Sequence, residues 1–155
     1  MPLPVPVIEL IAQDVLATLA GVTVENGFNY TLSAQRHSKA GDKRAHLSAV
    51  IVQEDPVEEP LKVYNTLEWR LVFSIGVFVI PSETDATAID TYCNLIRSDV
   101  EKAMMVDRYR GGNALDTLIR APRTGVEEGL EYDCIAIQVE VNYRTAETDP
   151  TVNAK

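Results

Sequence analysis

The sequence predicts an α+β domain in which two main helices pack on a mostly antiparallel sheet of about five strands. Two patterns support this prediction. Apolar residues alternate along 67–80 and 132–144, which indicates strands, and they recur at helical spacing along 8–19 and 89–104, which indicates helices. The predicted order is one helix, two strands, a long strand, a second helix and two further strands.

The first long alternating segment is the strand around which we expect the sheet to be organised. Its first half has Leu67 and Trp69 on one face and Glu68 and Arg70 on the other, so one side of this half meets water. In its second half both faces are mostly apolar, which is typical of a strand in the centre of a sheet. Pro81 ends the strand, because proline has no N–H for a strand ladder.

The two predicted helices have distinct start signals. The first, 8–19, follows a proline-rich leader that cannot lie inside a helix. The second is expected to start at Ser82, because Asp85 three residues later completes a capping pattern. The apolar stripe of 89–104 must face the sheet.

Two charged segments stand out between the first helix and the long strand. A half-buried strand at 28–35 and a strand at 47–53 are joined by a polar arm rich in cations, Arg36, Lys39, Lys43 and Arg44. An acidic loop follows, with Glu54, Asp55, Glu58 and Glu59. Solvated surface is one interpretation of both segments, and charged contact surface is the other.

The C-terminal third contains a turn and an unusually long strand. Gly111 and Gly112 follow the second helix and precede a short strand at 115–121, so they do not form the helix N-terminus that a phosphate site requires. The last strand, 132–144, spans roughly 40 Å at about 3.3 Å per residue. That length exceeds what a domain of this size needs for its own core.

Composition indicates one globular domain, residues 1–145, followed by a flexible polar tail, residues 146–155. A net charge of −9 and a pI near 4.7 argue against a protein that grips DNA or anionic lipid. No apolar run reaches the roughly 20 residues of a membrane span, and the first residues lack a secretory signal pattern. We therefore expect synthesis in the cytosol.

Residue types that carry chemistry are sparse. His37 and His46 lie in the basic arm without a Cys or carboxylate cluster, so no metal site is predicted. Cys93 and Cys134 form no CxxC pattern and are interpreted as small buried apolar residues. No nucleophile is placed beside a base, so we predict neither a catalytic residue nor a cofactor site.

Four segments together resemble a known family. They are 69–81 (W-R-L-V-F-S-I-G-V-F-V-I-P), 98–107 (S-D-V-E-K-A-M-M-V-D), 110–114 (R-G-G-N-A) and 139–150 (V-E-V-N-Y-R-T-A-E-T-D-P). The chain is similar, from the first helix to residue 150, to tail terminator proteins of long-tailed bacteriophages and prophages, also described as minor tail or tail-completion proteins. These motifs are structural rather than chemical.

The resemblance implies a structural virion protein and no enzyme. Such proteins form a ring, commonly of six subunits, that caps the tail tube at its final length and then receives the head connector. The implied partners are further copies of the chain, the tail tube protein and a head-completion or connector protein. The implied location is the tail or neck of the virion, after assembly in the host cytoplasm. Another ring-forming adaptor of the neck remains an alternative, as does a small enzyme or ligand-binding module.

Three surface predictions follow from this implied role. In a closed head-to-tail ring, the basic arm meets acidic surface on a neighbour, with residues 54–59 as the first choice. The polar face of the last strand lies at or near the subunit boundary, which involves Gln138, Glu140, Asn142 and Arg144. DNA passes through the ring without specific binding, so the lumen is electronegative. Solubility alone is the other explanation of the acidity.

Overall fold

The computed structural model describes residues 2–38, 41, 47–54, 58–79, 88–120 and 133–154. The described residues form two α-helices, a short 3-10 helix and six strands. In chain order these are α1 (Val7–Ala20), η1 (Val24–Asn26), β1 (Ser33–Arg36), β2 (Ser48–Gln53), β3 (Leu61–Val63), β4 (Thr66–Val79), α2 (Ile89–Val106), β5 (Asp116–Arg120) and β6 (Asp133–Ala146). The predicted α+β class is confirmed.

The strands form one sheet in the order β1-β2-β4-β6-β5, with β3 paired to one end of β4. All strand pairs are antiparallel except β1 with β2. β4 and β6 pair along their whole length, from Thr66 opposite Ala146 to Val79 opposite Asp133. The two longest strands predicted from the sequence are therefore neighbours at the centre of the sheet.

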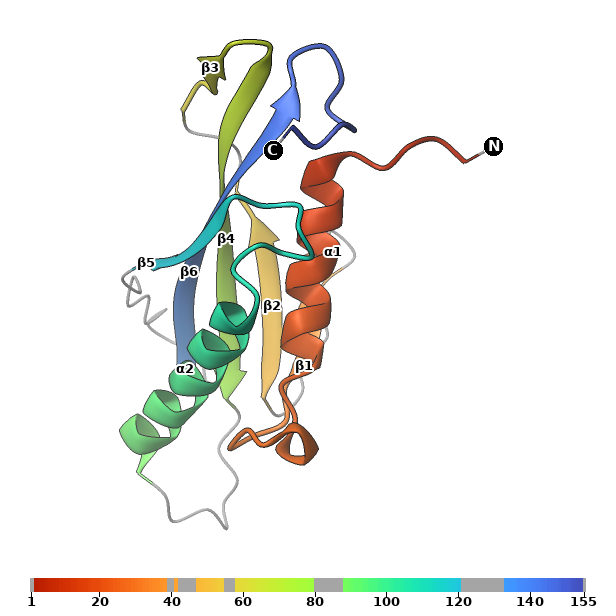
Figure 1. Cartoon of the computed structure of the whole chain (residues 1–155). Coiled ribbons are helices and arrows are strands. Elements are labelled where there is room, and N and C mark those ends of the chain that lie inside the picture. Colours follow the sequence, from red (N-terminus) through yellow and green to blue (C-terminus); the bar gives the residue numbers. More distant parts are fainter. Residues whose placement is uncertain are drawn as a thin grey trace.

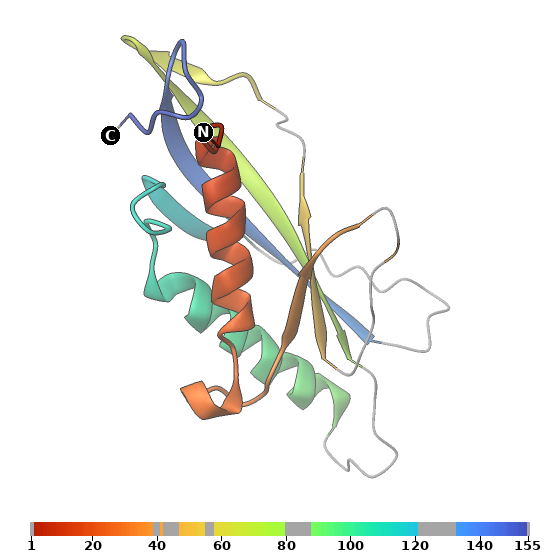
Figure 2. The same ribbon diagram turned by 90° about the vertical axis from the view of Figure 1, so that its right-hand side faces the viewer.

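Both helices cover the same face of the sheet (Figure 1), and in the turned view no helix of the described residues lies on the opposite face (Figure 2). Alternation along β4 and β6 explains this arrangement, because every second side chain points toward the helices. Burial of these side chains provides the main stabilisation. The core includes Ile11, Val15, Phe73, Ile75, Ile96, Val100, Val139 and Val141.

The sequence predicts a strand at 28–35. In the structure only the last residues of that range lie in a strand, β1, and 28–32 does not. The buried carboxylate of Asp99 on α2 explains the difference. It accepts hydrogen bonds from the backbone N–H of Asn29 at 2.9 Å and of Tyr30 at 3.1 Å. Donors bound to a side chain are not available to a strand ladder, so the chain turns here.

Several predicted boundaries lie outside the described residues, including Pro81, the helix start at Ser82 and the start of the last strand at residue 132. The described part of the second helix begins at Ile89. Strand β3 was not predicted. It forms a hairpin with β4 through Tyr64, which is 92% exposed and has a left-handed backbone with φ of 55°.

Residues 147–154, for which the sequence predicts a flexible tail, fold back along β6 in the structure. Ala146 N–H donates to the Val152 carbonyl, and Ala154 N–H donates to the Arg144 carbonyl. Pro150 accepts a hydrogen bond from Val7 N–H at the start of α1. This segment therefore covers the edge of β6 beyond the end of β5 and joins the two ends of the described chain.

Candidate functional site

The face of the sheet opposite the helices carries the polar residues that the sequence analysis assigned to a subunit boundary. The register places Arg144 opposite Glu68, Asn142 opposite Arg70 and Gln138 opposite Ser74. Paired residues point to the same face, so side chains from neighbouring strands meet there. We call these residues, together with Glu140 and the β5 residues Asp116 and Arg120, the polar sheet face.

A chain of ion pairs crosses this face. Glu140 accepts a hydrogen bond from Arg120 Nε at 2.7 Å, and Arg70 Nε lies 3.2 Å from its other carboxylate oxygen. Arg70 also contacts Glu58 at 3.2 Å. The side chain of Glu140 is only 4% exposed although it lies on the outer face, because the two arginines cover it. A buried carboxylate of this kind requires such partners.

The other charges of the polar sheet face are also paired within the chain. Arg144 contacts Glu68 through Nε and a terminal nitrogen, both at 2.9 Å. At the edge of the sheet, Arg108 binds both carboxylate oxygens of Asp116, at 2.9 and 2.8 Å. Among these arginines only Arg108 forms a fork of two nitrogens with two carboxylate oxygens, and every described arginine of the polar sheet face contacts at least one carboxylate.

The predicted basic arm and acidic loop are only partly described. Arg36 forms an ion pair with Glu9 at 2.8 Å, so its charge is already matched within the chain. Lys39, Lys43, Arg44 and Asp55 lie outside the described residues. The described acids of the loop do not act as one cluster.

Each described acid of that loop has a different setting. Glu54 bonds to Ser74 Oγ and lies 3.4 Å from Gln138 Nε2, so it belongs to the polar sheet face. Glu58 joins the ion-pair chain through Arg70. Glu59 lines a small hollow of about 140 Å³ at the base of the β3–β4 hairpin. Of the loop acids that the structure describes, Glu54 and Glu58 have partners on the polar sheet face, whereas Glu59 faces this hollow.

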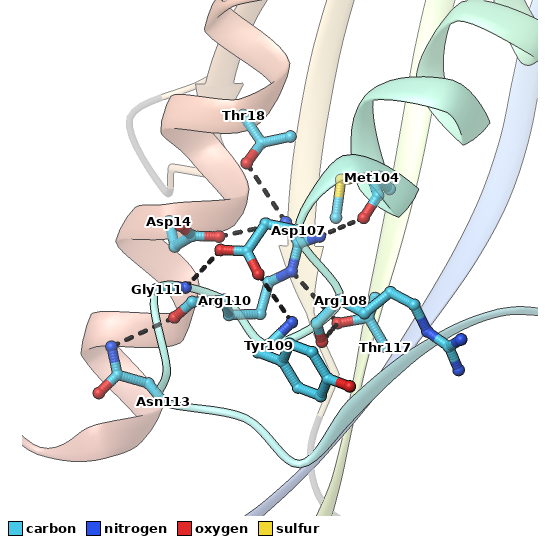
Figure 3. Close-up of polar contacts among 10 residues, drawn as sticks. All are labelled: Asp14, Thr18, Met104, Asp107, Arg108, Tyr109, Arg110, Gly111, Asn113 and Thr117. Atoms are coloured by element: carbon cyan, nitrogen blue, oxygen red, sulfur yellow. Dashed lines mark hydrogen bonds and ion pairs between the residues drawn. The ribbon is translucent and has the colours of Figure 1, made fainter.

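Sequence reasoning missed a buried arginine at the junction of α1, α2 and β5. Arg110 is fully buried and lies between the two helices (Figure 3). Its guanidinium donates to Asp14 at 3.1 Å, to Thr18 at 3.2 Å and to Thr117 at 3.2 Å, and also to the backbone carbonyl of Met104. Burial lowers the pKa of Arg110, and the carboxylates of Asp14 and Asp107 oppose that effect.

Gly111 and Gly112 follow Arg110 directly, and the turn that they form orients this arginine and is not a phosphate site. Arg110 has φ of 48°, and Gly111 and Gly112 have φ of 65° and 85°, so three successive residues are left-handed. The Asp107 carboxylate accepts hydrogen bonds from the backbone N–H of Gly111 at 2.7 Å and of Tyr109 at 2.9 Å (Figure 3), and these bonds lower the pKa of Asp107. The turn thereby directs the guanidinium inward. A lone arginine beside two glycines was the available sequence signal.

An open groove of about 440 Å³ lies between the C-terminal halves of α1 and α2. Small residues leave it open, and its walls are mainly apolar. Its apolar lining comes from Ala17, Gly21, Phe28, Ala103 and Val106, and its polar lining from Thr18, Asn26, Lys102 and Asp107.

Among the described residues, no group of three or more His, Cys, Asp or Glu side chains is arranged to hold a metal ion. No helix in the described part of the chain is both long and apolar enough to cross a membrane. The sequence matches no model of a known protein family and no curated protein.

Proposed function

We propose that this protein is a structural virion component, a tail terminator that forms a ring on the end of a phage tail tube. The ring ends tail elongation and offers the surface to which the head connector joins. The proposal rests on the sequence resemblance described above. Its location in the tail or neck of the virion is part of the same proposal.

The observation that supports it best is that the four family-like segments form one contiguous framework. The described part of 69–81 lies in β4, and 139–150 contains most of its partner β6. The segment 98–107 is the end of α2, and 110–114 is the turn that holds Arg110. Segments far apart in sequence thus share one packing unit, as expected if the resemblance reflects a common fold.

The polar sheet face supports an assembly role through its paired charges. Arginines held by carboxylates across three strands form a stiff, ordered surface, because several charges constrain one another. Such a surface suits either contact with a neighbouring subunit or passage of DNA without binding. Cations for contact with a neighbour would then come from the arm, whose Lys39, Lys43 and Arg44 lie outside the described residues, and Glu59 offers them an acidic partner.

Electron microscopy tests the proposal directly. The purified protein should form closed rings, and phage particles that lack it should carry abnormally long tails. Tails of normal length that fail to join heads would instead indicate an adaptor of the virion neck, the second candidate. A protein that stays monomeric at all concentrations would contradict both roles and favour a small enzyme or ligand-binding module.

A further inference from the structure

Residues 2–6 form an extended leader that projects from the start of α1 away from the body of the molecule (Figures 1 and 2). All five residues are exposed, and Leu3 is 88% exposed. Prolines at every second position remove backbone donors and restrict the chain to extended conformations. A segment restricted in this way loses little conformational entropy when it docks.

The groove between α1 and α2 offers a matching apolar surface. Its volume of about 440 Å³ lies within the roughly 300–1,000 Å³ of typical binding pockets. Val106 on its wall is 80% exposed, and Lys102 Nζ lies 5.0 Å from the centre of the Phe28 ring at its side. Val106 is therefore the exposed apolar side chain that this groove offers to another segment.

The chemistry of the two features corresponds. Extended proline-rich segments are recognised by apolar grooves that contain an aromatic ring, and Phe28, with Lys102 over its ring, lines this groove. The leader carries no charge and has only two backbone N–H donors, at Leu3 and Val5, and its carbonyls can stay in contact with water because the groove is open. Leu3 and Val5 supply the side chains that would fill the space beside Val106.

The leader cannot reach this groove on its own chain in the backbone path observed. The hydrogen bond of 3.1 Å from Val7 N–H to the Pro150 carbonyl fixes the start of α1. From Val7 to Ala17 the helix rises about 15 Å, at about 1.5 Å per residue. The leader is about as long, at about 3.1 Å per residue, but it leaves in the direction away from the groove (Figure 1).

We propose that the leader of one copy docks in the α1–α2 groove of a second copy. The contact uses a different surface on each subunit, so it is head-to-tail and closes when repeated around a rotation axis. This inference rests on the proposed ring and names the contact that would connect its neighbours. The occupant of the groove is therefore residues 2–6 of the adjacent subunit.

A groove-filling substitution with a matched control tests the contact. Ala17→Trp fills the groove, whereas Ala20→Trp places the same side chain at another exposed position of α1 that does not line it. In sedimentation velocity, wild type and Ala20→Trp should form the same oligomer, and Ala17→Trp should run as monomer at the same concentration. Leu3→Glu should reproduce the loss. Circular dichroism checks that each variant is folded.

Cross-linking gives an independent readout. Leu3→Cys and Val106→Cys variants, made separately, mixed and treated with oxidised glutathione as the oxidant, should form an intersubunit disulfide between these two positions, identified by peptide mass mapping. If no such link forms and Ala17→Trp keeps the wild-type mass, the leader contact is wrong while the ring stands. Equal loss of assembly in both tryptophan variants would also contradict it. If wild type itself is monomeric, both the ring and the contact are wrong.

Discussion

Replacing Glu68 and Glu140 with glutamine should turn the polar sheet face into a DNA-binding surface. In the native protein these two carboxylates neutralise Arg144, Arg120 and part of the charge of Arg70. Glutamine keeps the size of each side chain and removes its charge. Arg120 and Arg144 would then have no carboxylate partner among the contacts described, while Arg70 would keep Glu58 at 3.2 Å.

The magnitude follows from counting the freed arginines. Each phosphate that an arginine neutralises contributes about −0.9 to the slope of log affinity against log salt concentration. Two freed arginines per subunit therefore give a slope of about −1.8, so duplex affinity should fall about tenfold between 50 and 200 mM salt. The wild-type protein should show no measurable duplex binding near physiological salt, because its arginines are already matched.

Fluorescence anisotropy with a short labelled duplex, titrated at several salt concentrations, measures this effect. Glu25→Gln with Glu101→Gln is the matched control, because it changes the net charge of −9 by the same two units at positions off the polar sheet face. Binding gained only by the Glu68 and Glu140 variant supports the reasoning. Equal gain in both variants, or submicromolar salt-sensitive binding by wild type, would refute it.

Three further predictions concern stability and assembly. Arg110→Met should lower the free energy of unfolding by about 3–5 kcal/mol, because it leaves buried acceptors without a donor. Urea denaturation followed by the fluorescence of the single tryptophan measures this loss. A loss below about 1 kcal/mol would contradict the stabilising role of the hydrogen bonds around Arg110. Burial raises the pKa of Tyr143 to about 12, above the roughly 10 of a tyrosine in the unfolded chain. The contribution of the neutral Tyr143 side chain to stability is therefore complete below about pH 10, and it is lost at up to about 1.4 kcal/mol per pH unit as pH rises toward 12. Tyr143→Phe should lack this loss in the same denaturation series, and an identical pH profile in both proteins would count against it. Reversing Lys39, Lys43 and Arg44 to Glu should weaken assembly in a salt-dependent way, and light scattering that shows an unchanged oligomer would exclude the basic arm from the subunit contact.

Local periodicity determined the elements that carry the fold. Alternation along 67–80 and 132–144 reflects strands with differing faces, and the structure confirms β4 and β6 at nearly these positions. Helical spacing likewise located α1 and the described part of α2. These predictions succeed because burial of one face imposes a pattern on neighbouring residues, whatever the rest of the chain does. The same alternation placed Glu140 and Arg144 on the outer face.

Tertiary structure alone decided which of these residues meet. Arg144 contacts Glu68 across 76 positions of sequence, and Arg110 contacts Asp14 across 96. The residue type alone does not distinguish a buried arginine from an exposed one. Only the packing of α1 against the turn after α2 removes Arg110 from water. Likewise, the segment at 28–32 has the alternation of a strand, but the carboxylate of Asp99, on a distant helix, takes its backbone donors. Long-range pairing of this kind leaves no periodic trace, because each partner satisfies its local pattern equally well without the other.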